Sequence, residues 1–102
     1  MLDAVFARGT TPIHYYEIPY SAEDVQKVSI SYRQNGKNII VKREECKISD
    51  GAIAVQLSQE DTLKFQEGIA ISQIKILIST GEVLRSSDHY IKVLDTFDEE
   101  VF

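Results

Sequence analysis

Residues 28–42 read VSISYRQ-NG-KNIIVK, and this stretch decides the fold. Apolar and polar residues alternate from Val28 to Gln34, which is the period of a half-buried β-strand. Asn35-Gly36 is the strongest two-residue signal for a type I′ turn, because both residues tolerate a positive φ. The stretch therefore predicts a β-hairpin, and with it a β-sheet protein.

The register of this hairpin predicts which side chains face the interior. A two-residue turn places Tyr32 opposite Ile39 and Ile30 opposite Val41, so these side chains share one face of the sheet. Extending the same alternation to the other strands predicts one hydrophobic core, which consists of Ile30, Tyr32, Val41, Val55, Leu57, Phe65, Ile74 and Ile76.

The rest of the chain shows similar alternation between turn signals. Further strands are predicted over residues 12–18, 52–57, 69–79 and around 90–93. Ile69 and Ile71 lie in the opposite phase to Ile74, so either a bulge lies near Ser72-Gln73 or the two isoleucines face outward or into an interface. A three-residue loop over residues 80–82, with Gly81 in the left-handed region, pairs Ile78 with Leu84.

One short segment interrupts the β pattern. Ser58 is followed three residues later by Asp61, which resembles a capping box, and Glu60 lies where a helix dipole favours an acidic side chain. Because a glycine and another β pattern follow, the helix must be short. We expect one or two helical turns near residues 59–65 at the end of a β-sandwich of about seven antiparallel strands.

Composition limits the classes of partner. The chain has 102 residues, is 43% hydrophobic and carries a net charge of −5. An acidic chain with scattered basic residues argues against binding nucleic acid. No apolar run approaches the roughly 18 residues of a membrane span, so no membrane insertion is expected. Residues 1–8 do not resemble a signal peptide, and the single Cys46 excludes an internal disulfide.

The residues suggest no catalytic, cofactor or metal site. His14 and His89 are far apart in sequence and, with one cysteine, lack the ligand spacing of a zinc site. We interpret them as surface or packing residues, and Cys46 as a small buried apolar group. A metal or catalytic site would require that folding bring His14, His89 or Cys46 close together. We therefore expect a protein that is not an enzyme and binds no cofactor or metal.

The tyrosines near the first strand leave three interpretations open. Tyr15, Tyr16 and Tyr20 can pack in the sandwich, line a protein interface, or, with Tyr90, stack on sugar rings. The third interpretation gives the alternative function, a carbohydrate-binding module for cell-wall glycans.

Four segments carry a resemblance to a known family. They are residues 8–20 (RGTTPIHYYEIPY), the hairpin around Asn35-Gly36, residues 55–65 (VQLSQEDTLKF) and residues 74–86. Together they resemble small immunoglobulin-like proteins encoded in phages and prophages of Gram-positive bacteria, over about residues 8–94. The chain is also similar, more loosely, to the immunoglobulin-like N-terminal domain of phage upper baseplate proteins.

The resemblance implies an immunoglobulin-like β-sandwich with a structural role in the tail or baseplate of a virion, made in the host cytoplasm. It supplies no catalytic residues. We expect an N-terminal arm over residues 1–10, a sandwich over 11–94 and an acidic tail over 95–102. The arm and tail carry apolar residues that either fold back or dock on other phage structural proteins or a second copy. The expected partner-binding residues are Leu2, Val5, Phe6, Tyr16, Tyr20, Ile69, Ile71, Phe97, Val101 and Phe102.

Overall fold

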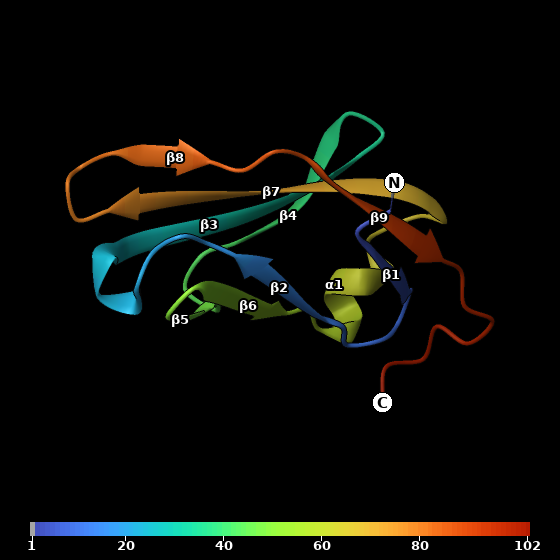
Figure 1. Ribbon diagram of the computed structural model, residues 1–102. Helices are drawn as coiled ribbons and strands as arrows, with labels where there is room; N and C mark the ends of the chain where they lie inside the picture. Colours follow the sequence, from blue (N-terminus) through green and yellow to red (C-terminus); the bar gives the residue numbers. More distant parts are fainter. Residues whose placement is uncertain (1) are drawn as a thin grey trace.

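The computed structural model describes residues 2–102 as two β-sheets packed face to face, with one short α-helix at one end (Figure 1). The larger sheet has the order β1-β9-β7-β3-β4, with β8 paired to β7, and the smaller sheet has the order β2-β6-β5. The elements are β1 (Ala4–Ala7), β2 (Ile13–Glu17), a 3-10 turn η1 (Ala22–Asp24), β3 (Val25–Gln34), β4 (Lys37–Lys42), β5 (Lys47–Ser49), β6 (Ala52–Gln56), α1 (Gln59–Leu63), β7 (Gly68–Ile78), β8 (Val83–Arg85) and β9 (His89–Leu94).

The strand order is that of an immunoglobulin-like sandwich, which confirms the predicted fold class. β2, β6 and β5 occupy the places of strands B, E and D, while β3, β7 and β9 occupy those of C, F and G. β4 extends the larger sheet beyond strand C, as in variable-type domains. The helix α1 lies between β6 and β7, at the corner between the two sheets.

The N-terminal segment departs from the expected arrangement. Ala4–Ala7 form β1, which pairs in parallel with β9, so the sheet is not purely antiparallel. Within this strand Phe6 is only 5% exposed. The predicted arm over residues 1–10 is therefore partly a strand of the sandwich, and Met1 lies outside the described residues. The alternating pattern is too short over four residues to reveal such a strand in the sequence.

The β3–β4 hairpin forms with the predicted turn but a shifted register. Asn35 and Gly36 have φ values of 54° and 77°, as a type I′ turn requires. Tyr32 pairs with Ile40, not Ile39, because β4 contains a bulge beside the turn. The extra residue moves every later side chain of β4 to the opposite face.

This bulge corrects one member of the predicted core. Ile40 is buried in place of Val41, which is half-buried. The other seven predicted core residues are buried, with exposures from 0% to 6%. The core extends further into both sheets, where it includes Phe6, Tyr16, Ile53, Ile91 and Val93.

The long strand β7 has some isoleucines that face the core and others that face outward. Ala70, Ser72 and Ile74 face the core, so Ile69 and Ile71 face outward without a bulge between them. Four residues, 79–82, separate β7 from β8, where a three-residue loop was predicted. Ile76, not Ile78, therefore pairs with Leu84. Gly81 has a φ of 91°, in the left-handed region.

The helix α1 begins with the predicted capping box. The Ser58 side chain accepts from the Asp61 backbone N–H, and the Asp61 carboxylate accepts from the Ser58 N–H. Lys42 Nζ lies 2.7 Å from Asp61 Oδ2, which ties the end of β4 to the helix. Burial raises the pKa of Asp61, but the hydrogen bonds from Lys42 and Ser58 outweigh it and leave that pKa below its usual range. The helix thus closes one end of the sandwich over the buried Phe65.

Candidate functional site

Exposed apolar side chains, and the half-buried Ile71, gather on the outer face of the larger sheet. We call this surface the outer-face patch, and it consists of Val5, Ile69, Ile71, Tyr90 and Leu94. Val5 and Ile69 both pair with Lys92, on opposite sides of β9, and Ile71 pairs with Tyr90. The patch thus joins three strands that are far apart in sequence. It brings together Val5, Ile69 and Ile71, three of the expected partner-binding residues.

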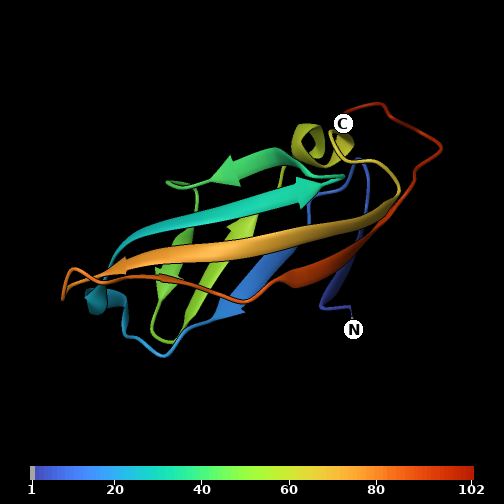
Figure 2. The ribbon, with the colours of Figure 1, turned by 90° about the horizontal axis from the view of Figure 1, so that it is seen from above.

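The tail holds the second group of expected partner-binding residues. Phe97 and Phe102 are fully or almost fully exposed, and Val101 is 44% exposed. Both views of the ribbon place this tail beside α1, at one end of the molecule (Figures 1 and 2). The tail and the outer-face patch are therefore separate surfaces.

Arg8 fixes the root of the tail. Its Nη1 lies 2.8 Å from Asp95 Oδ1 and 3.3 Å from Glu99 Oε2. Its Nε donates to the Phe65 carbonyl oxygen at 2.7 Å. The hydrogen bond from Arg8 lowers the pKa of Asp95 below its usual range. The first part of the tail therefore folds back on its own chain, while its aromatic side chains remain exposed.

The other expected partner-binding residues differ in accessibility. Phe6 and Tyr16 are buried in the core, so the structure corrects their assignment to a docking surface. Both lie on short edge strands whose inward phase the sequence did not reveal. Tyr20 is partly buried and packs against the core, whereas Leu2 is 46% exposed.

A groove lies where β3 has no neighbour on one side. β7 pairs with β3 from Val25 to Arg33, but β4 pairs only with residues 30–34 of β3. Figure 2 shows β4 beside the second half of β3 alone. In the described part of the chain, no strand pairs with the other edge of residues 25–29. Alternate residues of this segment thus present backbone N–H and C=O groups to an open edge.

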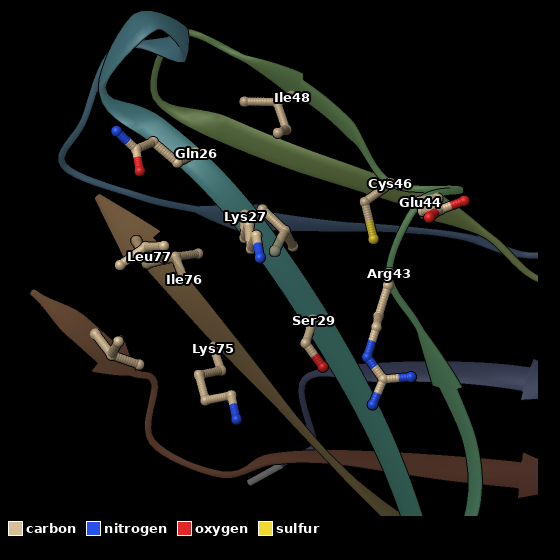
Figure 3. A pocket seen from close by; sticks show the side chains of 12 residues that line it. Gln26, Lys27, Ser29, Arg43, Glu44, Cys46, Ile48, Lys75, Ile76 and Leu77 are labelled. Carbon is tan, nitrogen blue, oxygen red and sulfur yellow. The ribbon is translucent and has the colours of Figure 1, made fainter. Parts of the chain in front are cut away.

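We call the depression beside this segment the edge groove, and its volume is about 730 Å³. Its lining on β3 is Gln26–Ser29, and across it stand Arg43, Glu44, Cys46 and Ile48 (Figure 3). Lys75, Ile76, Leu77 and Val83 extend the lining over β7 and β8. Apolar side chains and an unpaired strand edge thus share one depression.

Cationic side chains distinguish the edge groove from the rest of an acidic protein. Lys27, Arg43 and Lys75 line it, and Glu44 is the single acidic residue in its lining. Within residues 2–102, no carboxylate lies within 4.0 Å of these three cationic groups. An acidic, extended segment therefore has complementary charge for this groove.

Cys46 contributes a thiol to the edge groove. The side chain is half-buried, and its Sγ lies 3.8 Å from the Lys42 carbonyl oxygen. Burial, and then the nearby Glu45 carboxylate, raise the pKa of the Cys46 thiol. A raised pKa reduces the thiolate fraction at neutral pH, so this cysteine is a weak nucleophile.

A buried hydrogen-bond network lies between the sheets. His14 Nδ1 and the Tyr32 hydroxyl oxygen are 2.6 Å apart, and the Tyr16 hydroxyl lies 2.6 Å from Ser72 Oγ. The Tyr16 hydroxyl also donates to that of Tyr32 at 3.4 Å. Burial raises the pKa of both phenols and lowers that of His14, so all three side chains are neutral at pH 7. The network fills the interior and offers no exposed reactive group.

The two histidines meet at a second, smaller depression of about 260 Å³. His14, His89, Asp3 and Tyr16 are among the residues that line it. His14 Nε2 is buried without a hydrogen-bond partner, and the His89 ring stands edge-on to that of Tyr16. Within residues 2–102, however, no three His, Cys, Asp or Glu side chains are arranged to hold a metal ion.

The tyrosines do not form a platform for a sugar. Tyr16 is buried, and Tyr20 packs against the core. Tyr15 is 72% exposed and Tyr90 is 41% exposed, but they lie on strands of different sheets. Because each points away from the core, their rings face opposite sides of the sandwich.

The comparisons with known proteins concern the fold. No protein-family model matches the chain, and no curated protein matches it. Among solved structures, CopC from Methylosinus trichosporium OB3b aligns with a TM-score of 0.63 and 13% identity, over 96% of this chain and 89% of that one. At such low identity, this similarity shows a shared β-sandwich fold and no more.

Two immunoglobulin-type structures align less closely. A strand-swapped dimer of the immunoglobulin-like domain of mouse leukocyte-associated immunoglobulin-like receptor 1 has a TM-score of 0.47 at 13% identity, over 88% of this chain and 85% of that one. Murine CRIg has a TM-score of 0.45 at 9% identity, over 92% of each chain. Neither similarity bears on what this chain binds.

Sequence reasoning missed the edge groove, although one signal for it was present. The first strand of the hairpin alternates from Val28, and the second ends where Arg43-Glu44-Glu45 begins. If the first strand begins before residue 28, its additional N-terminal residues therefore have no partner within the hairpin. The sequence did not show whether β5 would fill that place.

No helix within residues 2–102 has the length and apolar character to span a bilayer.

Proposed function

We propose that this chain is a non-enzymatic structural module of a phage or prophage, which acts by protein–protein docking in the tail or baseplate. The phage assignment is supported by the resemblance over residues 8–94. The docking role is supported by the outer-face patch, which is the observation that carries this proposal. The proposed partners are other structural proteins of the same particle or a second copy of the chain.

The chemistry of the outer-face patch suits a protein partner. Val5 is 55% exposed and Ile69 is 48% exposed, and both flank the aliphatic stem of Lys92. Contiguous exposed apolar side chains are typical of interaction sites, and tyrosine is enriched in interfaces. Tyr90 beside Ile71 adds such an aromatic group. Burial of this surface against a partner would remove its apolar atoms from water.

The reactive side chains support a non-enzymatic role. A general base needs access to the proton it removes, but His14 is buried and its Nε2 has no hydrogen-bond partner. A thiol nucleophile needs a lowered pKa, and burial raises that of Cys46. These two groups therefore lack the environments that acid–base and nucleophilic catalysis require.

The experiment follows the chain into purified particles. Particles of the phage or prophage that encodes the chain are isolated by density gradient, and the chain is quantified by mass spectrometry relative to the major tail protein. We expect the chain to be present in a fixed ratio. If it is absent from particles that contain the other tail proteins, the proposed function is wrong.

A matched pair of variants tests the role of the patch. Ile69→Glu places a charge in the outer-face patch, whereas Ile13→Glu places the same charge on β2 of the other sheet, and both isoleucines are 48% exposed. We expect Ile69→Glu to reduce incorporation into particles and Ile13→Glu to leave it close to the wild-type level. Equal incorporation of the two variants would contradict docking through this patch.

A further inference from the structure

We propose that the edge groove of one copy binds the tail of a second copy, with residues 97–102 added as an extra strand beside residues 25–29 of β3. This inference rests on the proposed docking function and names one partner for it. It concerns a different surface from the outer-face patch, so the two can fail independently.

The backbone of the groove is suited to an added strand. Residues 25–29 pair with β7 on one side only, while the same strand is paired on both sides from residue 30 onward. An extended segment beside residues 25–29 would continue the line that β4 begins. Addition of a strand to an open sheet edge satisfies backbone groups of both chains and is a recurrent mode of peptide recognition.

Charge complementarity points to the tail as the occupant. Lys27, Arg43 and Lys75 line the groove without an ion pair in the described chain. Arg8 holds Asp95 and Glu99 of the tail, but among residues 2–102 no basic group lies within 4.0 Å of the carboxylates of Asp98 and Glu100. The tail thus offers unpaired acidic groups to a groove that carries unpaired basic groups.

The spacing of residues in the tail matches the two faces of a strand. In an extended segment Asp98 and Glu100 point to one face and Val101 to the other. Lys27 and Lys75 lie on the outer face of the sheet, whereas Val28 faces the core side. Placing the two acids outward therefore places Val101 toward Val28, Cys46 and Ile48.

The shape of the molecule favours an exchange between copies. The tail lies beside α1, whereas the start of β3, whose residues 26–29 line the edge groove, lies toward the opposite end (Figures 1 and 2). The long axis of the molecule is 47 Å. Arg8 anchors the root of the tail at the α1 end through Asp95. Because the tail and the groove are different surfaces, their contact either closes into a ring, of which a reciprocal two-fold dimer is the smallest, or continues as an open filament.

The bonds that the tail would give up are few and exposed. Arg8 Nη1 would release Glu99 Oε2, from which it lies 3.3 Å. Three hydrogen bonds would also open: Thr96 Oγ1 donates to the Asp98 carbonyl oxygen at 3.1 Å, Glu100 N–H donates to Asp98 Oδ1 at 2.9 Å, and Phe102 N–H donates to Gln59 Oε1 at 2.6 Å. Pairing with β3 replaces them with backbone hydrogen bonds. Docking also covers part of Phe97 and Phe102, which are 111% and 92% exposed in the single chain.

The single native cysteine allows a direct test, because Cys46 lies in the groove. A Val101→Cys/Cys46→Ser chain is activated at its new thiol as a mixed disulfide with thionitrobenzoate, then added to wild-type chain. Attack of the Cys46 thiolate on the activated sulfur forms the disulfide between chains and releases coloured thionitrobenzoate. Because docking raises the effective thiol concentration to the millimolar range, exchange at about 50 μM chain should exceed the undocked rate by roughly tenfold or more.

The control places the activated cysteine outside the tail. Val5→Cys/Cys46→Ser uses a residue that is also exposed, on β1. We expect it to react with wild-type Cys46 at the undocked rate. If the Val101→Cys chain reacts no faster than the Val5→Cys chain, the inference is wrong. An internal disulfide in a Val101→Cys chain that keeps Cys46, formed at a rate independent of concentration, would also overturn it.

Charge reversal tests whether the tail and groove recognise each other. Asp98→Lys/Glu100→Lys in the activated tail chain, or Lys27→Glu/Lys75→Glu in the groove chain, should each return exchange to the undocked rate with an unaltered partner. Combining the two reversed chains should restore fast exchange. Loss without restoration would contradict the charge pairing. If no pair of chains cross-links, the inference is wrong, whereas incorporation into particles still tests the proposed function separately.

Discussion

The two halves of β3 belong to one strand but have different surroundings. Residues 30–33 lie between β4 and β7, whereas residues 25–29 pair with β7 alone. Within the first group, Ile30 and Tyr32 are completely buried. The alternation of apolar and polar residues runs from Val28 to Gln34 and is interrupted at Gln26-Lys27, where the pairing with β7 shifts. What separates them is the end of β4 at Lys42, after which the chain leaves the sheet.

The closed half is held by side chains as well as by strands. The Gln34 side chain donates from Nε2 to the Gln66 carbonyl oxygen at 2.7 Å and accepts at Oε1 from the Gln66 N–H at 2.8 Å. In the open half, Lys27 and Ser29 lie beside the edge groove. The comparison teaches that one strand can supply stability at one end and accessible backbone at the other, as expected when binding uses less protected segments.

The largest expected difference between the halves is in core packing. Ile30→Ala empties a completely buried site in the closed half and should cost roughly 2–5 kcal/mol of unfolding free energy. Val28→Ala removes fewer atoms at a site beside the groove, so about 1.5 kcal/mol is expected, at about 0.8 kcal/mol per buried carbon. Urea denaturation measures both values. A loss below about 1 kcal/mol for Ile30→Ala would contradict this account of the closed half.

The next effect tests the buried network that crosses the closed half. Tyr32→Phe removes the hydroxyl that contacts His14 Nδ1 and leaves both ring nitrogens of that histidine without a partner. A buried polar group left without its hydrogen bond costs about 1–3 kcal/mol. Tyr15→Phe is the control, because Tyr15 is 72% exposed, and it should change stability by less than about 0.5 kcal/mol. If Tyr32→Phe changes the unfolding free energy as little as Tyr15→Phe does, the network is energetically neutral.

The same network predicts a dependence of stability on pH. Burial lowers the pKa of His14 below its usual 6.5. Below that pH the unfolded chain binds a proton that the folded chain resists, so stability is complete above pH 6.5 and falls as the pH drops, by at most about 1.4 kcal/mol per unit. The lowered pKa of Asp61 acts in a separate window, because that stabilisation is lost only as the pH falls below about 3.8.

Denaturation at pH 7.5, 6.5 and 5.5 measures this slope. His14→Gln removes the imidazole, so the variant should lose less stability than the wild type between pH 6.5 and 5.5. If the variant retains the full slope, another group is responsible and the assignment to His14 is wrong.

The sequence was sufficient for the fold where local signals are strong. The Asn35-Gly36 turn, the capping box of Ser58 and the long alternation of β7 each depend on residues close in sequence, and all three are confirmed. The register of β4 was not predictable, because a bulge beside the turn adds one residue without a distinctive sequence signal. The strand at Ala4–Ala7 depends on pairing with β9, almost ninety residues away in the chain.

The candidate surfaces were predictable only in part. The alternation of β7 left two alternatives for Ile69 and Ile71, a bulge or an outward phase, and their approach to Val5 depends on the order of the strands. The edge groove depends on where three strands end and on the path of residues 43–46. Such a surface belongs to the tertiary structure, so no single motif in the sequence could reveal it.

The smallest expected effect is measured on the unaltered chain and compares the two halves of β3. Hydrogen exchange of backbone amides, followed by NMR at low concentration, should show slow exchange throughout residues 30–33, which have strands on both sides. In residues 27–29 exchange should alternate, slow for amides that face β7 and faster for those that face the open edge. Raising the concentration should slow only the exposed set, because the tail of a second copy would then cover that edge. Uniform protection of both halves at low concentration would mean that the edge of residues 25–29 is already covered within a single chain, and the distinction between the halves would fail.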